Sequence, residues 1–312
     1  EAAMAIAKKL GYPVLIKAVA GGGGKGMRIA RNDVSLVQGY MTARAEAERA
    51  FGNPDVYVEK LVERARHIEV QLLADNHGHV YQLGERDCSI QRRHQKLLEE
   101  TPSPALTPDR RKKLLKSAVR AAQACKLRNV ATIEFLWNED AQEFYFMEMN
   151  TRIQVEHPIT EEVTGVDLVQ LQIRAAAGEV LKFADDEFAP RGHAIEVRVN
   201  AENPYKNFTP SPGPIQVVHF PGGPGIRVDS HVYSGYVIPP FYDSMIGKII
   251  ARGKNREEAL TRMARALAEF KMAGPATTVP VAQALLADAR FLRGEYNTHF
   301  LEQFMNDVFW VS

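Results

Sequence analysis

Two glutamates and the residues around them have the types and spacing that best fit a catalytic site in this sequence. Residues 132–157 read TIEFLWNEDAQEFYFMEMNTRIQVEH, and two apolar, aromatic-rich runs around a polar segment predict a β-hairpin. A turn centred near Ala141 would place Glu134 opposite Glu148, to within one position. Because side chains alternate along a strand, Asn150 would lie on the same face as Glu148.

Paired carboxylates of this kind predict a metal site. Like charges that face each other across two strands are destabilising unless a cation lies between them. Mg²⁺ takes one or two carboxylates and completes its shell with water and substrate phosphates. We therefore expect Glu134, Glu148 and Asn150 to hold Mg²⁺ (or Mn²⁺), whereas one such glutamate alone would more simply be solvated. We also expect glutamine at either position to leave the metal-free fold as stable or slightly more stable.

The polar segment after the hairpin continues the alternation with Arg152, Gln154 and Glu156. This segment is too polar to be a core strand. Together with the paired carboxylates before it, we interpret the whole stretch as the floor of an active site.

A glycine-rich loop is the second feature that could do chemistry. Residues 21–26 read GGGGKG and lie between two strand-like runs, 14–20 and 27–30. A dinucleotide-binding fold needs a helix after such a loop and a P-loop needs Lys followed by Ser or Thr, so neither fits. A protein kinase is excluded as well, because no HRD or DFG motif follows. We interpret the loop, with Lys17 and Lys25, as a flap over phosphates rather than a flexible hairpin tip, because bare glycine amides approach phosphate oxygens closely.

Three further polar patterns accompany this loop. The strand-like run 56–62 contains Glu59 and Lys60, which fits either an adenine-binding hinge or a plain edge strand. The alternation in 66–73 predicts His67, Glu69 and Gln71 on one face. Donors and positive charges are concentrated in one short run, which fits an anion-binding loop or a solvated one equally well: Gln91, Arg92, Arg93, His94 and Lys96.

The elements that must position these residues can be outlined from their start and stop signals. Helices are predicted over 33–49 after Asn32, over 107–127 with Pro108 at its first turn, and over 167–177, 255–272 and 276–288. A strand over 193–200 would align Glu196, Arg198 and Asn200 on its polar face. Segments rich in Pro and Gly after it predict tight turns between short strands.

Composition restricts the class of protein. The chain has 312 residues, 45% of them hydrophobic and 25% charged, with a net charge of +1, which fits a globular protein of two or three subdomains and no bulk attraction to nucleic acid or membranes. Cys88 and Cys125 lie far apart, which fits a reducing compartment; we expect the cytoplasm or an organelle matrix. The chain opens inside a helix pattern without an initiator Met, so we expect further sequence upstream.

Several of these motifs occur together, and in this order, in one known family. The glycine flap is followed by GERDCSIQRRHQKLLEE, the paired glutamates, EMNTRIQVEHPITEEVTGVDLV, RGHAIEVRVNAENP, SPGPI and YDSMIGKII. In these motifs, over nearly its whole length, the chain resembles biotin carboxylase, the ATP-grasp component of acetyl-CoA carboxylase and its relatives. The resemblance implies an α+β fold with a truncated ATP-grasp lid over 1–62, an ATP-grasp core over 63–190 and a C-terminal region over 191–312. It also implies a mixed, mainly antiparallel sheet in the larger part.

The resemblance also implies the reaction and the roles of matching residues. ATP and bicarbonate would form carboxyphosphate, and the carboxyl group would pass to N1′ of biotin on a carrier. The implied contacts of the nucleotide are Lys17, Gly23 and Gly24 in the lid, Glu59, Lys60 and Leu61 in the adenine hinge, and His67, Gln91, His94, Leu136, Glu134 and Glu148 elsewhere. The implied bicarbonate site comprises Lys96, Arg152, Gln154, Val155 and Glu156, with Glu156 as general base. Arg198 would stabilise the enolate of biotin, because arginine keeps its charge at any working pH.

The implied partners are a biotin carboxyl carrier protein or domain, a carboxyltransferase component and, in the full-length form, a second copy of the chain. Acetyl-CoA would be the final acceptor, in fatty acid biosynthesis. The family's chain begins with a further α/β domain that this sequence does not contain, so we expect the 312 residues alone to be inactive. Two alternatives stay open: another ATP-grasp ligase of the carbamoyl-phosphate or purine-pathway type, and an inactive fragment that acts only in assembly.

Overall fold

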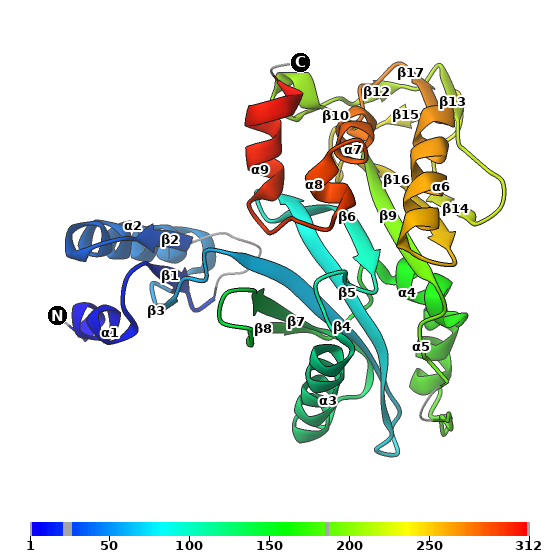
Figure 1. Cartoon of the computed structure of the whole chain (residues 1–312). Helices are drawn as coiled ribbons and strands as arrows, with labels where there is room; N and C mark the ends of the chain where they lie inside the picture. The colour runs from blue at the N-terminus through cyan, green and yellow to red at the C-terminus, as the bar shows by residue number, and fades with distance from the viewer. Residues whose placement is uncertain (1, 21–26, 185–186, 311–312) are drawn as a thin grey trace. The chain divides into compact units, whose positions relative to one another are not determined.

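The computed structural model describes residues 2–20, 27–184 and 187–310 of the chain. The chain divides into two compact units, one of residues 1–63 with 93–95 and one of residues 64–92 with 96–312. Both units combine strands and helices (Figure 1). This confirms the predicted α+β class.

The described part of the smaller unit is a three-stranded antiparallel sheet with two helices. The strand order is β2–β1–β3. The elements are α1 (Ala2–Leu10), β1 (Val14–Ala18), β2 (Met27–Ala30), α2 (Asp33–Phe51) and β3 (Val56–Lys60). Helix α2 begins as predicted, because Asn32 and Ser35 satisfy each other's backbone N–H in a capping box. It ends at Gly52, whose left-handed conformation favours glycine.

The larger unit is organised around one sheet, which within the described residues holds eight strands. The strands are β4 (Ala65–Ala74), β5 (Val80–Arg92), β6 (Gln95–Thr101), β7 (Asn129–Asn138), β8 (Glu143–Asn150), β9 (His193–Asn200), β14 (Ile226–Ser230) and β16 (Met245–Gly253). Their order across the sheet is β14–β16–β9–β6–β5–β4–β7–β8. The pairs on either side of β4, β7, β9 and β16 are antiparallel, which confirms the expected pairing.

The two faces of β4 have opposite characters because its sequence alternates. Ile68, Val70 and Leu72 pack against α3 (Pro108–Ala124) in a fully buried cluster. The other face carries His67, Glu69 and Gln71, followed by Leu73, which belongs to a separate core cluster. The cluster against α3 fixes the register of the strand, and the three polar side chains are held in place without contributing to that core.

The C-terminal part adds a second large core over β9 and β16. Its helices are α6 (Arg256–Glu269), α7 (Val279–Leu285), α8 (Ala289–Leu292) and α9 (Phe300–Phe304). Short pieces connect them: β10 (Glu202–Asn203), η1 (Pro204–Lys206), β11 (Thr209–Pro210), β12 (Gly213–Pro214), β13 (Val217–His219), β15 (Val237–Ile238), β17 (Lys271–Ala273) and the π-helical turn η2 (Met305–Phe309). The short strands pair as β10–β11, β12–β15 and β13–β17, as the Pro- and Gly-rich segments predicted.

One helix was not predicted, and one predicted helix is shorter than expected. After Asn150 the chain leaves the sheet and enters α4 (His157–Thr164), the helix that was not predicted. The helix predicted over 255–272 ends at Glu269, since the next residues pair with β13. The helix predicted over 167–177 is confirmed as α5 (Leu168–Ala176), capped by Asp167.

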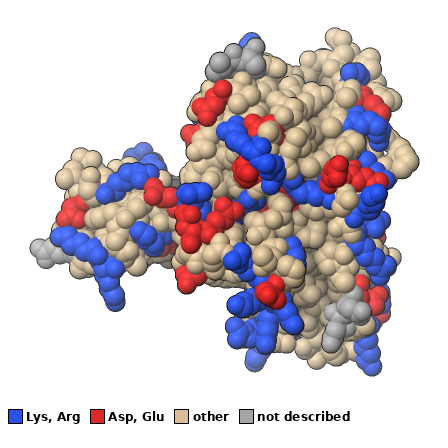
Figure 2. All heavy atoms as spheres, viewed as in Figure 1, with Lys and Arg blue, Asp and Glu red and all other residues tan. Residues whose placement is uncertain are grey.

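None of the helices in the described residues is long and apolar enough to cross a membrane. Charged side chains cover much of the face shown in Figure 2, with Lys and Arg gathered over α3 and Asp and Glu gathered near β8. Neither sign dominates this face, in keeping with the net charge of +1.

Candidate active site

The β7–β8 hairpin has the predicted register. Glu134 lies directly opposite Glu148, and a bulge follows between Glu134 and Phe135. The Asn150 amide lies on the same face and donates to Glu134 Oε1 and Glu148 Oε1, each at 3.2 Å. Glu134 is buried, whereas Glu148 is exposed. One carboxylate of the pair therefore belongs to the interior, and the other is open to solvent.

Lys96 lies at the centre of the polar face. Its Nζ donates to Glu156 Oε1 at 2.5 Å, Glu69 Oε2 at 2.6 Å and Glu134 Oε1 at 3.2 Å. Burial alone would lower the pKa of the ammonium, but the three carboxylates outweigh it and raise that pKa well above its usual value. Lys96 therefore remains charged, and all three of its donors are engaged.

Arg86 forms the rear wall of this cluster and is completely buried. Its guanidinium donates to Glu69 Oε1 at 2.6 Å, Gln71 Oε1 at 2.8 Å, Thr160 Oγ1 at 3.0 Å, and Thr132 Oγ1 and Gln154 Oε1 at 3.3 Å. Burial would raise the pKa of Glu69, yet Lys96 and Arg86 together bring it to about 2. A buried arginine with this many acceptors fixes the orientation of the side chains around it.

Glu156 is held between two cations. Besides Lys96, Arg198 Nη2 donates to Glu156 Oε2 at 2.9 Å. The Nε of Arg198 donates to Glu99 Oε1 at 2.7 Å, so Arg198 bridges β6 and the segment before α4. Glu156 stands at the N-cap position of α4 without a side-chain hydrogen bond to that helix. Its carboxylate therefore faces the cluster.

The segment 151–156 carries the other three predicted bicarbonate contacts, Arg152, Gln154 and Val155. Each of them has a different partner in the structure. Gln154 is buried and donates to Glu134 Oε1 at 2.9 Å. The Val155 carbonyl accepts from Lys248 Nζ at 2.8 Å. Arg152 is exposed, and its guanidinium donates to the Ile153 carbonyl at 3.2 Å. Among the described residues, Arg152 forms no ion pair with the carboxylates of the cluster.

The residues of the hairpin fit a divalent cation. Two carboxylates and an amide meet on one face, and hard oxygen ligands of this kind suit Mg²⁺. A half-turn of the Asn150 amide would present its oxygen instead of its nitrogen. The exposed side of Glu148 gives the ion a route of entry.

The expected repulsion across the strands is wrong for Glu134, because the Lys96 ammonium already lies beside it. Lys96 is 3.2 Å from Glu134 Oε1 and His67 Nε2 is 3.1 Å from Oε2. Burial would raise the pKa of Glu134, but His67 and Lys96 bring it to about 2. The ionised form of Glu134 is therefore stabilised by the fold itself. His67, Glu69 and Glu134 also bring ligand atoms within 4.8 Å of one another, and Lys96 neutralises that group.

The predicted nucleotide contacts of the larger unit lie near the hairpin. His67 is the cross-strand partner of Leu136, which lies on the same face of β7 as Glu134. Gln91 is buried, with Nε2 3.4 Å from His67 Nδ1. The strands β4, β5 and β7 thus bring together residues from 67, 91 and 134–136. His94, in the turn between β5 and β6, belongs to the smaller unit.

The predicted nucleotide contacts of the smaller unit are only partly described. Lys17 on β1 forms an ion pair with Glu59 on β3 at 3.1 Å. Lys60 Nζ donates to the Gly11 carbonyl at 2.9 Å. The Leu61 N–H donates to the Pro13 carbonyl, so an adenine ring would need a different donor from this hinge. Gly23, Gly24 and Lys25 lie outside the described residues.

Sequence reasoning missed four residues of this site: Glu69, whose face was predicted but not its role, and Arg86, Glu99 and Lys248. Lys248 is the one charged residue in the buried run 246–251 of β16, and Glu99 follows two leucines in β6. A charged residue is almost never fully buried unless it is paired. That rule, applied to predicted core strands, could have identified both.

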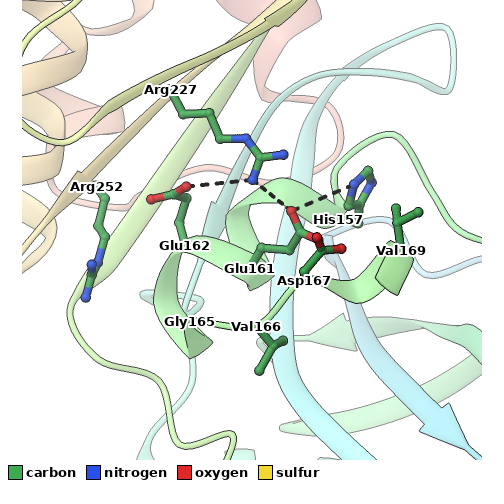
Figure 3. Close-up of a pocket in the computed structure, with 9 residues that line it drawn as sticks. All are labelled: His157, Glu161, Glu162, Gly165, Val166, Asp167, Val169, Arg227 and Arg252. Atoms are coloured by element: carbon green, nitrogen blue, oxygen red, sulfur yellow. Dashed lines mark hydrogen bonds and ion pairs between the residues drawn. The ribbon is translucent and has the colours of Figure 1, made fainter. Parts of the chain in front are cut away.

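A second hollow lies beyond α4. It is an open cavity of about 640 Å³ lined by residues of α4, α5, β14 and β16, with acidic side chains turned toward Arg227 (Figure 3). Arg227 donates to Glu161 Oε2 at 2.7 Å and to both carboxylate oxygens of Asp229, at 2.8 and 2.9 Å. Its guanidinium is thus paired with carboxylates. Arg252 also lines the cavity, and among the described residues it forms no ion pair and donates only to the Arg191 carbonyl, at 3.4 Å.

Comparison with known proteins gives two matching families. Residues 1–184 match the family described as "Carbamoyl-phosphate synthase L chain, ATP binding domain", and residues 196–303 match the "Biotin carboxylase C-terminal domain". Biotin carboxylase 1 of Bacillus subtilis is 55% identical over 97% of this chain and 68% of its own length. A pyruvate carboxylase component of Methanothermobacter thermautotrophicus is 52% identical over 99% of this chain and 62% of its own. The chain thus spans about two thirds of the length of these relatives.

Solved structures agree with the sequence matches. The biotin carboxylase domain dimer of the 2-oxoglutarate carboxylase of Hydrogenobacter thermophilus, solved with MgADP, ADP and bicarbonate, has a TM-score of 0.93 and 48% identity. The alignment covers 97% of this chain and 66% of that one. A biotin carboxylase from Campylobacter jejuni, in a β,γ-ATP complex, has a TM-score of 0.92 and 42% identity, covering 95% of this chain and 66% of that one. The ATP-grasp type of fold expected from the sequence is therefore confirmed.

Proposed function

The chain belongs to the biotin carboxylase family, and from that premise we propose that the protein carrying it uses ATP and bicarbonate to carboxylate biotin. The observation that supports this most strongly is the position of Glu156, whose carboxylate is held by Lys96 at 2.5 Å and Arg198 at 2.9 Å. Two fixed cations beside one carboxylate can hold a small anion and a base together. Bicarbonate activation needs both.

The residues of the larger unit divide the first half-reaction among them. Lys96 and Gln154 would orient bicarbonate, with Arg152 and the Val155 backbone closing the site. Glu156 would take the proton of bicarbonate as one bicarbonate oxygen forms a bond to the γ-phosphorus, while the bond from that phosphorus to ADP breaks and ADP leaves. All donors of Lys96 are engaged, and Glu134 is its longest contact, at 3.2 Å. Glu134 is also a proposed ligand of the metal, so a turn of Glu134 toward Glu148 would free one donor of Lys96 for the substrate.

ATP and Mg²⁺ are the proposed cofactors. Bound between Glu134, Glu148 and Asn150, Mg²⁺ would neutralise the phosphate charge that develops during transfer. Lys17, Gly23, Gly24, Glu59, Lys60 and Leu61 in the smaller unit, and His67, Gln91, His94 and Leu136, are the proposed nucleotide contacts. The Lys17–Glu59 ion pair raises the pKa of Lys17 above its usual value in spite of burial, which keeps a positive charge next to the glycine run.

Arg198 would serve the second half-reaction. Carboxyl transfer requires biotin to lose the N1′ proton, which places negative charge on its ureido oxygen. A fixed guanidinium stabilises such an oxyanion more than the neutral ureido group. Anchoring of Arg198 by Glu99 and Glu156 holds it in one orientation before biotin arrives.

The proposed partners follow from this chemistry. Biotin would be presented on a carrier protein or domain, a carboxyltransferase component would take the carboxyl group onward, and the full-length protein would act as a homodimer, as in the dimeric relative. The final acceptor that we propose is acetyl-CoA. The test is to incubate carboxylated carrier with the cognate transferase and acetyl-CoA, pyruvate or 2-oxoglutarate in turn. Discharge of the carrier decides between acetyl-CoA and the two acceptors that the relatives' names suggest.

The test of the proposed function is fixation of [¹⁴C]bicarbonate by the full-length protein. We expect acid-labile label on free biotin that depends on ATP and Mg²⁺. Label that appears with ammonia or a purine precursor instead, and never on biotin, would favour another ATP-grasp ligase. ATP-dependent fixation on none of these acceptors would contradict the proposal.

A further inference from the structure

Glu196 is a buried carboxyl group that the roles above do not use. It lies on β9 and is completely buried, and neither of its oxygens has a hydrogen-bond partner among the described residues. Directly opposite on β6 is Glu99, which is also completely buried. Glu99 Oε1 accepts from Arg198, but Glu99 Oε2 has no partner in the described structure. Two acidic side chains thus meet in the interior with three unsatisfied oxygens.

A single proton shared by the two side chains would remove their mutual repulsion and give two of the three oxygens a hydrogen-bond partner. Two carboxylates directly opposite on neighbouring strands repel each other, and a buried carboxylate without a partner is costly. If Glu196 carries a proton, its O–H can donate to Glu99 Oε2 and satisfies two of the three oxygens. The nearest alternative cation is already occupied, because Lys248 donates to the Val155 carbonyl at 2.8 Å and lies 3.7 Å from Asp229 Oδ2.

We propose that Glu196 and Glu99 share one proton, carried by Glu196, and that this pair is the positioning element that holds Arg198 against Glu156. With one negative charge the pair binds Arg198 through Nε and leaves Nη2 directed at Glu156. A doubly ionised pair would draw the guanidinium away from Glu156, and a neutral pair would release it. The positioning role rests on the proposed function of Arg198; the shared proton does not.

The environment of the pair supports this assignment. Glu196 faces Glu99 from β6, Lys248 from β16, Arg198 from its own strand and Glu156 from the segment before α4. Burial, followed by the charge of Glu99, raises the pKa of Glu196 well above its usual value. Burial also raises the pKa of Glu99, to about 7, in spite of Arg198. The two side chains therefore retain one proton near neutral pH, as carboxyl pairs at short range do.

Thermal unfolding of the full-length protein across pH tests the shared proton. A carboxyl group whose pKa is raised by folding stabilises fully only below its unfolded value of 4.5, and that contribution is lost as pH rises toward the folded value. Glu196→Gln cannot ionise, so it should be as stable as wild type at about pH 5 and increasingly more stable toward about pH 8.

Glu100→Gln is the matched control. Glu100 follows Glu99 on β6 and is equally buried, but contacts with His193 and Arg256 lower its pKa in spite of burial. This control should therefore lose stability at neutral pH. If Glu196→Gln lost stability in the same way, Glu196 would be an ionised group with a partner, and the shared proton would be excluded.

Infrared spectra and kinetics separate the proton from its role. The carbonyl stretch of a protonated carboxyl group should be present in the wild type and in Glu100→Gln, and lost in Glu196→Gln. Its absence from the wild type would overturn the assignment.

Kinetics test the positioning role. Glu196→Leu offers no hydrogen to Glu99, so kcat/KM for biotin should fall on the order of tenfold, and Glu196→Gln, which restores a donor, should recover most of the loss. Equal activities of the two variants would contradict the positioning role. If the wild type did not carboxylate biotin at all, the proposed function would fail, while the infrared and stability results would still decide the proton.

Discussion

At the scale of single residues, the site is a balance of charges held at hydrogen-bond distance. Lys96 joins Glu69, Glu134 and Glu156, and Arg198 joins Glu156 to Glu99. Each carboxylate that orients a cation also limits what else that cation can bind. Substitutions should therefore have different effects according to which half-reaction uses the freed group.

Arg198→Ala should separate the two half-reactions in the full-length protein. Arg198 is assigned to the ureido oxyanion of biotin, which forms only after bicarbonate has been activated. Loss of one oxyanion-stabilising donor reduces kcat by about 10²–10³-fold. We expect that loss in biotin carboxylation, measured with [¹⁴C]bicarbonate, and a much smaller one in bicarbonate-dependent ATP cleavage. An equal fall in both rates would show that Arg198 acts on bicarbonate instead.

Glu134→Gln and Glu148→Gln should differ in stability although both remove a proposed metal ligand. The pKa of Glu134 is lowered from 4.5 to about 2, so its ionised form contributes stability above pH 4.5 that is lost as pH falls toward 2. Glu134→Gln should lower the free energy of unfolding by on the order of 2–3 kcal/mol at neutral pH. Glu148 is exposed and accepts a hydrogen bond from the Asn150 amide. Its replacement should change the free energy of unfolding little.

Both substitutions should abolish the stabilisation by Mg-ATP. Melting curves of the full-length variants with and without Mg-ATP measure both effects. Retention of the wild-type Mg-ATP shift by Glu148→Gln would contradict the metal site.

At the scale of elements, the sheet holds the site because each strand alternates. Ile68, Val70 and Leu72 fix β4 against α3, and this places His67, Glu69 and Gln71 on the opposite face. The segment 151–156 lies outside the sheet, so no strand pairing holds it in place. Its position depends on side chains of other elements, among them Lys248 of β16.

Lys248→Met should loosen this segment. The Nζ of Lys248 donates to the Val155 carbonyl at 2.8 Å, and methionine keeps the length of the side chain without the donor. We expect KM for bicarbonate to rise on the order of tenfold, since a hydrogen bond from a charged group is lost, while the affinity for ADP is unchanged. Lys254→Met, at an exposed position after the same strand, serves as the control. Unchanged KM in both variants would show that Val155 is held by other contacts.

The sequence predicted those elements whose signals are local. The hairpin register followed from two aromatic runs and a polar turn, and the start of α2 followed from Asn32. Helix α4 was missed although Pro158 and Gly165 mark its ends, because a helix of eight residues is too short to show a clear hydrophobic period. Lys96, Glu134 and Glu156 come from three distant segments. Only the fold shows that one ammonium joins them, and that this ion pairing removes the repulsion expected at Glu134.

At the scale of the whole molecule, the chain spans about two thirds of the length of its relatives. We expect the isolated 312 residues to show no measurable carboxylation of free biotin. The full-length protein, assayed beside it with [¹⁴C]bicarbonate, provides the control. Equal rates for the two would contradict this expectation.

The central claim is that Glu156, between Lys96 and Arg198, is the base of the bicarbonate half-reaction. The most direct measurement is the rate of bicarbonate-dependent ATP cleavage and of biotin carboxylation in full-length Glu156→Gln, with Arg198→Ala beside it. Glutamine keeps the shape and the hydrogen-bonding reach of Glu156 but cannot take a proton, and general base catalysis typically contributes about 10²–10⁴-fold. We expect Glu156→Gln to lose both activities by that factor and Arg198→Ala to lose mainly carboxylation. Bicarbonate-dependent ATP cleavage by Glu156→Gln at the wild-type rate would contradict the claim.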